Sequence, residues 1–144
     1  MDKYTAGHSD RVTVYARITA EQMGESSDQI ELVVQAGALH DIGKLGCHAN
    51  LNKAGKLTSE EYGIFKEHPE FGKDIIEPIS FLHAIIPGVQ FHHERWDGKG
   101  YPRGLAGKDI PKIARILAVA DAYDAMTSNR AYRRALNHEV AVNE

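Results

Sequence analysis

The sequence has few of the features that mark secreted, membrane-bound or DNA-binding proteins. Its single cysteine, Cys47, cannot form an internal disulfide and fits a reducing compartment. No apolar run approaches the roughly 20 residues that span a bilayer, and the N-terminus lacks the layout of a signal peptide. The 17 basic and 20 acidic residues are interspersed, whereas duplex DNA and anionic membranes attract concentrated Lys and Arg. We therefore expect a cytoplasmic protein with no DNA partner and no membrane insertion.

The sequence also lacks the alternating apolar pattern of β-strands. Its 144 residues suit one domain with one hydrophobic core. Two segments, 43–57 and 97–111, lack a sustained period and are predicted to be loops, the second with four glycines and two prolines. We predict an all-α, single-domain helical bundle over residues 1–144, with about six to seven helices and this glycine-rich loop near the active site.

Two helices are predicted before residue 42. The first ends at Gly24, and its inward face is predicted to carry His8, Val12, Tyr15, Thr19 and Met23. The second is capped by Ser26 or Ser27. Its apolar face leads directly to His40 and Asp41, so both side chains should lie near the core.

The later helices follow from capping residues and prolines. Thr58 and Glu61 form a capping-box pattern, which predicts a helix from there to His68. Pro69 then begins a new helical turn. Further helices are predicted within 70–94, at 111–127 and after Asn137.

Acidic side chains on buried helix faces need a positive partner. Asp121 lies in an apolar helical run, and a buried carboxylate costs several kcal/mol unless it is paired or bound to a metal. No Lys or Arg lies within a helical turn of Asp121 on that face. Inward faces and helix ends also hold five histidines, namely His8, His40, His68, His92 and His93. Imidazole and carboxylate together suit Mn, Fe, Ni or Zn.

Each of these residues also has a simpler explanation. A lone inward histidine is more often a hydrogen-bonded core residue. His40 and Asp41 would then form a local cap, Asp121 would pair with a buried His or Arg, and His92 and His93 would lie at a solvated helix end. These explanations do not account for five histidines and two aspartates falling together on inner faces or helix ends, and this coincidence favours a multi-metal site.

Four motifs resemble the HD-GYP family, bacterial phosphodiesterases of the signalling dinucleotide cyclic di-GMP within the HD hydrolase superfamily. The motifs are His40-Asp41-Ile42-Gly43-Lys44, His68-Pro69, His92-His93-Glu94-Arg95-Trp96-Asp97-Gly98-Lys99-Gly100-Tyr101-Pro102, and Asp121-Ala122-Tyr123-Asp124-Ala125-Met126-Thr127. They occur in the family's order, and the resemblance covers residues 4–144.

The resemblance implies a binuclear metal site. One ion would be held by His8, His40, Asp41 and Asp121, and the other by Asp41, His68, His92 and His93, with Asp41 bridging. Fe or Mn is expected, with Zn or Ni as alternatives, and such ions make hydroxide available near neutral pH. The implied catalytic residues are Asp41 and Lys44. The implied substrate-binding residues are Lys44, Tyr101, Arg130 and Arg133.

The chain departs from the family at two places. Some members have a glutamate where this chain has Tyr4, and they use it to support a third metal; here we expect two ions. The loop after Lys44 is one residue shorter than usual and lacks its proline, which leaves its path open and makes His48 an additional but less favoured ligand. Family members usually carry a sensory or receiver domain first, so we expect an excised catalytic domain with an N-terminal regulatory domain in the full-length protein.

Three functions are considered. The first is hydrolysis of cyclic di-GMP to the linear dinucleotide pGpG, to GMP, or to both. The second is a phosphohydrolase of the same superfamily that acts on another nucleotide or cyclic dinucleotide. The third is a catalytically weak module that senses the dinucleotide or docks onto diguanylate cyclase (GGDEF) domains. A homodimer is left open.

Overall fold

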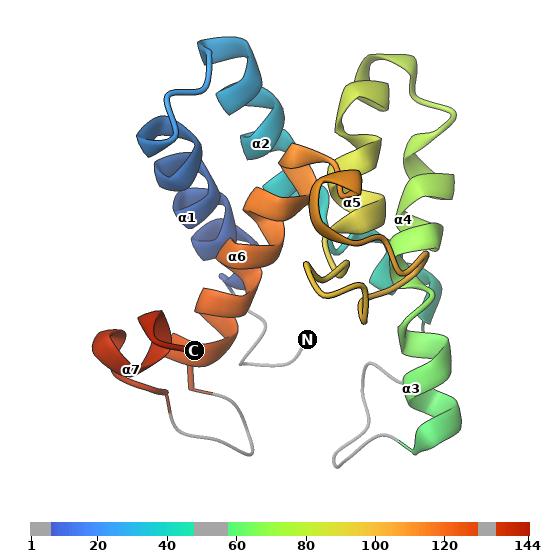
Figure 1. The fold of residues 1–144 in the computed structure, drawn as a ribbon. Coiled ribbons are helices and arrows are strands. Elements are labelled where there is room, and N and C mark those ends of the chain that lie inside the picture. Colours follow the sequence, from blue (N-terminus) through green and yellow to red (C-terminus); the bar gives the residue numbers. More distant parts are fainter. Residues whose placement is uncertain (1–6, 48–57, 130–134) are drawn as a thin grey trace.

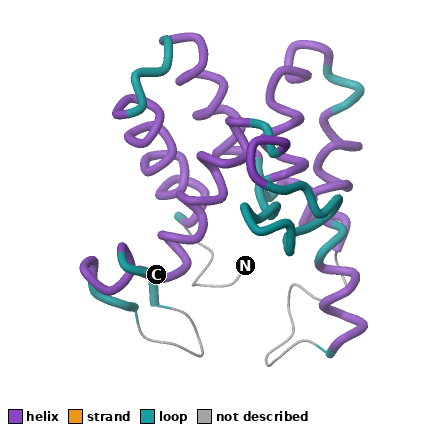
Figure 2. The backbone as a smooth tube through the Cα atoms, viewed as in Figure 1, coloured by secondary structure: helices purple, strands orange, loops and turns teal. Residues whose placement is uncertain are grey.

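The computed structural model describes residues 7–47, 58–129 and 135–144. Within these ranges the chain forms α-helices and short 3-10 helices and no strand, which confirms the predicted all-α class (Figures 1 and 2). The elements are α1 (His8–Gln22), α2 (Ser27–Leu39), η1 (Ile42–Cys47), α3 (Ser59–Phe65), α4 (His68–Ile76), η2 (Ser80–Ile85), α5 (Ile86–Phe91), η3 (Gly107–Asp109), α6 (Lys112–Thr127) and α7 (His138–Val142). None of these helices is both long enough and apolar enough to cross a bilayer.

The core lies where α1, α2 and α6 pack together, with α5 completing it (Figure 1). The buried residues of α1 are His8, Val12, Ala16 and Ala20. The predicted inward position of Met23 is wrong, because its side chain is 53% exposed, and Tyr15 and Thr19 are only half-buried. Two of the four residues in this stripe are alanines, Ala16 and Ala20, which let helix backbones approach closely. The larger apolar residues lie at its edge.

Helix α3 begins and ends for different local reasons. The Thr58 hydroxyl accepts from Glu61 N at 3.2 Å, and the Glu61 carboxylate accepts from Thr58 N at 2.7 Å, so the predicted capping box is confirmed. The predicted continuation to His68 is wrong, because α3 ends at Phe65. Pro69 has no N–H to donate to the Phe65 carbonyl four residues earlier. The chain therefore turns, and α4 begins at His68.

The glycine-rich loop after α5 is held by a buried carboxylate. Glu94 is 3% exposed, and its two oxygens accept from Arg103 N at 2.7 Å and Leu105 N at 3.0 Å. A Cβ at Gly100 would lie 2.5 Å from the Glu94 Cα, so the loop folds this tightly only with glycine there. This anchoring fixes the path of the segment that carries Tyr101.

Candidate metal centre

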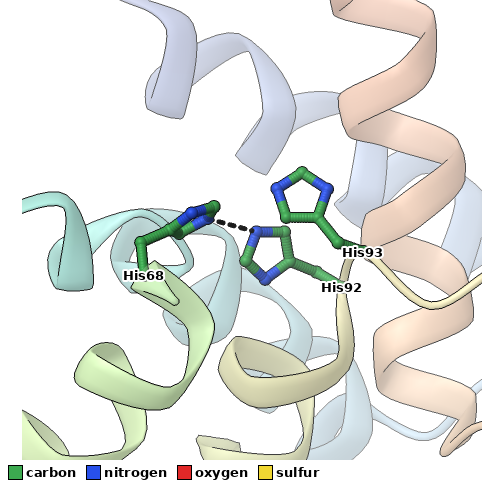
Figure 3. A group of neighbouring side chains, drawn as sticks. All are labelled: His68, His92 and His93. Carbon is green, nitrogen blue, oxygen red and sulfur yellow. Dashed lines mark hydrogen bonds between the residues drawn. The ribbon is translucent and has the colours of Figure 1, made fainter. Parts of the chain in front are cut away.

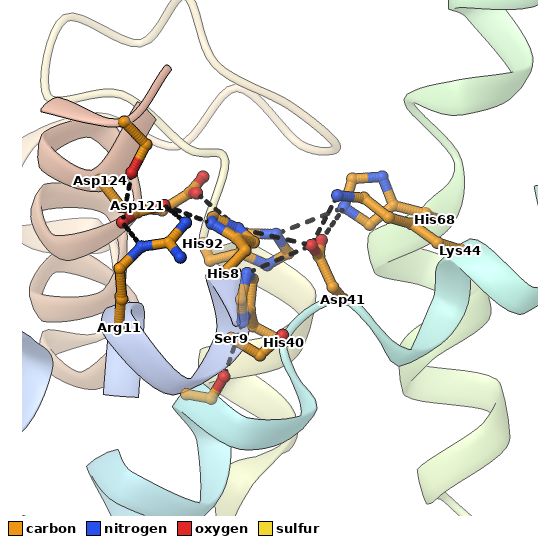
Figure 4. A network of polar contacts seen from close by, with 12 residues as sticks. His8, Ser9, Arg11, His40, Asp41, Lys44, His68, His92, Asp121 and Asp124 are labelled. Carbon is orange, nitrogen blue, oxygen red and sulfur yellow. Dashed lines mark hydrogen bonds and ion pairs between the residues drawn. The ribbon is translucent and has the colours of Figure 1, made fainter. Parts of the chain in front are cut away.

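Asp41 lies at the turn between α2 and η1, and side chains from α1, α4, η1 and the turn itself converge on its carboxylate (Figure 4). Oδ2 lies 2.5 Å from Lys44 Nζ, 3.4 Å from His40 Nε2 and 3.6 Å from His8 Nε2. Oδ1 lies 3.5 Å from His68 Nε2. The two oxygens of Asp41 thus face different imidazoles, Oδ2 those of His8 and His40 and Oδ1 that of His68, an arrangement that suits a bridging ligand.

Gly43 explains how the turn carrying Asp41 reaches α4. A Cβ at Gly43 would lie 1.8 Å from His68 O and 2.4 Å from Gly72 N, distances that no side chain allows. Glycine therefore lets η1 lie directly against the backbone of α4. This contact brings Asp41 and His68 into one cluster although they are far apart in the sequence.

Three of the histidines are oriented by the same kind of hydrogen bond to the backbone. His40, His68 and His92 each place Nδ1 2.7 to 2.8 Å from a backbone carbonyl three residues earlier. These carbonyls lie at the ends of helices, where they have no intrahelical partner; the carbonyl of Phe65 is the one that Pro69 leaves free. A carbonyl only accepts, so we assign the proton of each ring to Nδ1. Each Nε2 then presents its lone pair to the interior of the cluster.

His8 is held by two carboxylates of α6. Its Nε2 lies 3.3 Å from Asp121 Oδ1, and its Nδ1 lies 2.7 Å from Asp124 Oδ2. Asp124 is 1% exposed and also accepts from Arg11 Nε at 2.6 Å and Ser128 Oγ at 3.0 Å. Sequence reasoning singled out Asp121 but missed Asp124 and Arg11. Each lies three residues from a recognised site position, Asp124 from Asp121 and Arg11 from His8, and this helical spacing was the available signal.

Several Nε2 atoms of the cluster's histidines lack a positively charged partner for their lone pairs. The Nε2 atoms of His68 and His92 are 3.3 Å apart (Figure 3), and with both protons on Nδ1 they face each other with lone pairs. The Nε2 of His40 is buried and has no hydrogen-bond partner among the residues that the structure describes. Two triads have donor atoms close enough to share an ion, His8 with His40 and Asp41, and His68 with His92 and His93. A divalent cation in each triad would satisfy these atoms, so the residues fit a metal centre.

Burial keeps most of the cluster's imidazoles neutral. It lowers the pKa of His68 and of His92, and it lowers the pKa of His93 to about 4. Burial alone would raise the pKa of Asp41, but electrostatic interactions with His40 and with the Lys44 ammonium outweigh it and hold that pKa well below the usual range. His8 differs, because its hydrogen bond to Asp121 raises its pKa. The triad of His68, His92 and His93 therefore offers neutral nitrogen donors beside an ionised Asp41, which is the protonation state that metal ligands need.

Tyr101 closes one side of the centre. Its ring stacks on the His93 ring with centroids 4.8 Å apart and an interplanar angle of 27°. The ammonium of Lys66 lies 5.6 Å from the Tyr101 ring centroid and 4.8 Å from that of Tyr62. A tyrosine, a second aromatic ring and a cation therefore lie together beside the second triad.

The structure brings together all the residues predicted as metal ligands, together with Lys44 and Tyr101. The set is His8, His40, Asp41, His68, His92, His93 and Asp121. Arg130 and Arg133, predicted to bind the substrate, lie outside the described residues, as does His48. Glu94 is a further residue whose role the sequence did not reveal, because its partners are backbone N–H groups of a loop.

Comparisons with curated proteins find relatives that act on cyclic dinucleotides. The chain is 43% identical to a cyclic di-GMP phosphodiesterase of Thermotoga maritima, over 99% of this chain and 40% of the relative. It is 38% identical to the cyclic di-GMP phosphodiesterase response regulator RpfG of Xanthomonas campestris pv. campestris, over 98% of this chain and 38% of that protein. It is 40% identical to 3'3'-cGAMP-specific phosphodiesterase 3 of Vibrio cholerae, over 92% and 29% respectively. The chain thus spans less than half the length of these relatives.

A solved structure and a family model agree with those matches. The HDG"Y"P protein Bd1817 of Bdellovibrio bacteriovorus superposes with a TM-score of 0.73 over 84% of this chain and 40% of that one, at 25% identity. The match confirms the helical fold expected from the resemblance to the HD-GYP family. A family model described as "HD domain" matches residues 2–144. The chain therefore belongs to the HD domain family.

Proposed function

We propose that this chain is the catalytic domain of a metal-dependent phosphodiesterase that hydrolyses cyclic di-GMP to pGpG, to GMP, or to both. The observation that carries the proposal is the convergence of imidazole nitrogens and carboxylate oxygens around Asp41. Relatives named as cyclic di-GMP phosphodiesterases, at 38% and 43% identity, support the choice of substrate.

In this proposal the cluster holds two divalent ions, with Fe or Mn preferred over Zn or Ni. The first would be held by His8, His40, Asp41 and Asp121, and the second by Asp41, His68, His92 and His93. When bound, such ions supply Lewis-acid charge and make water acidic enough to provide hydroxide near pH 7. No nucleophilic side chain is required.

Lys44 and Tyr101 would position the substrate. The Lys44 side chain is 24% exposed while its ammonium contacts Asp41, so it stands at the mouth of the cluster and can donate to a phosphate oxygen. Charge-assisted donors of this kind stabilise the negative charge that develops in the transition state. Tyr101 offers an aromatic face beside His93, against which a nucleobase or ribose can pack.

The direct test is to incubate metal-loaded protein with cyclic di-GMP and resolve the products. Replacing His68→Gln removes an expected ligand, whereas His83→Gln is a matched control, since His83 is exposed and donates only to the Glu77 carbonyl. We expect turnover in the wild type and the control and none in the His68 variant. Absence of turnover with either Mn or Fe would contradict the proposal.

A second candidate substrate is 3'3'-cGAMP, because the chain is also 40% identical to a phosphodiesterase specific for it. Parallel assays with both dinucleotides, in the wild type and in Tyr101→Ala, would show whether the loop sets selectivity. Tight binding of a dinucleotide with intact metal content and no hydrolysis would instead support a sensing module. An N-terminal regulatory domain, docking onto GGDEF domains, a homodimer and a cytoplasmic location stay predictions.

A further inference from the structure

The imidazole of His8 contacts two carboxylates that both belong to α6. Asp121 and Asp124 are three residues apart on α6, so both point toward α1. Asp121 Oδ1 lies 3.3 Å from His8 Nε2, and Asp124 Oδ2 lies 2.7 Å from His8 Nδ1 (Figure 4). The same residue type at neighbouring helical positions therefore meets opposite nitrogens of one ring.

The surroundings of the two carboxylates differ. The Asp124 side chain is 2% exposed, and donors occupy both its oxygens: Arg11 Nε at 2.6 Å and Ser128 Oγ at 3.0 Å on Oδ1, and Arg11 Nη2 at 3.1 Å on Oδ2. The Asp121 side chain is 18% exposed and faces the cluster beside Asp41. Asp124 is thus saturated by hydrogen-bond donors, whereas Asp121 has an oxygen directed at the expected ion.

The shorter contact decides where the His8 proton lies when the ring is neutral. A distance of 2.7 Å to a buried carboxylate is that of a charge-assisted hydrogen bond, so the proton belongs on Nδ1. The lone pair of Nε2 then points at Asp121 and at Asp41, 3.6 Å away. A lone pair that faces two carboxylates needs either a second proton on Nε2 or a metal cation, and a divalent ion there would take the place of that proton.

We infer that Asp124, neutralised by Arg11, is the positioning residue of His8, and that it fixes the ring orientation and tautomer which let His8 bind the first metal ion. This inference rests on the proposed metal site. It gives the two acids of one motif different roles. Asp121 is itself a metal ligand, whereas Asp124 binds Nδ1 of the ligand His8, on the side of the ring away from the metal. Such outer partners typically change metal affinity by about 10 to 100-fold when they are removed.

The test is chelator-competition titration of Zn²⁺ into the wild type and Asp124→Asn. The amide either turns an N–H toward His8 Nδ1, which moves the ring proton to Nε2, or opposes the Arg11 guanidinium. We expect one of two ions to bind about 10 to 100-fold more weakly and the other to bind unchanged. Ser128→Ala is the matched control, because it removes a hydrogen bond to Oδ1 only, and both affinities should persist. Two unchanged affinities in Asp124→Asn would overturn the inference.

A measurement on the wild type covers the case in which the variant does not fold. Imidazole ¹⁵N shifts of the Zn²⁺-loaded protein should show His8 protonated at Nδ1 and metal-bound at Nε2. A His8 ring that is protonated at Nε2, or bound to metal through Nδ1, would overturn the inference and leave the proposed function standing. A wild type that binds no divalent ion would instead overturn the proposed function.

Discussion

The substitution Gly43→Ala should push η1 away from α4 and so move Asp41 away from His68. The added Cβ would meet His68 O at 1.8 Å, and ordinary van der Waals contact begins at 3.4 Å, so η1 and α4 must move apart by about 1.6 Å. The atoms in the way belong to the backbone of α4 and cannot rotate aside. Overpacking typically costs about 1–3 kcal/mol, and we expect the upper end, about 3 kcal/mol. For a chain of this size that lowers Tm by about 10 °C.

The assay is thermal and urea unfolding of metal-free protein, followed by metal titration. Gly63→Ala is the matched control, since no atom of the described residues lies within 4 Å of a Cβ at that helical position; it should raise stability by about 0.5–1 kcal/mol. Gly43→Ala should also bind metal more weakly, because Asp41 moves away from His68. Equal stability and metal affinity in Gly43→Ala and the wild type would refute the close-approach argument.

Three further predictions concern single side chains. Lys44→Gln should keep its metal content but lose about 100-fold or more in kcat; an unchanged kcat would remove Lys44 from the mechanism. Glu94→Gln should lose about 2–3 kcal/mol of unfolding free energy in urea, because one loop N–H then faces an amide N–H; a neutral result would show that the loop is anchored otherwise. Burial raises the pKa of the Cys47 thiol, so Ellman's reagent at pH 8 should react slowly with native protein and fast after unfolding. Rapid native reaction would contradict the buried placement.

The sequence predicted which imidazoles and acids come together, because such residues at helix ends are chemically distinctive and their motifs are ordered; their role as metal ligands stays a prediction. It singled out Asp121 and gave no role to Asp124, although helical spacing places both on one face. Only three-dimensional contacts show that Arg11 saturates Asp124. The break after Phe65 was also missed, although Pro69 marks it, because the capping box specifies where a helix begins and not where it ends.

The orientation of the histidines was beyond sequence reasoning for a different reason. A carbonyl three residues earlier is available only if a helix ends at that point, and helix ends are the least certain feature of a sequence-based prediction. The site therefore depends on helix termini near Gly37, Phe65 and Val89. Gly43 shows the same limit: its motif was recognised, but its close contact with α4 depends on how two distant segments pack.

The most direct test of the central claim is anomalous diffraction from crystals grown with Zn²⁺. We predict two peaks on either side of the Asp41 carboxylate, one beside His8 and His40 and the other beside His68 and His92, each about 2.0–2.2 Å from its ligand atoms. Both peaks should disappear in Asp41→Asn crystals, or one should weaken strongly. Density with no ion among these side chains, or with ions only elsewhere, would contradict the account.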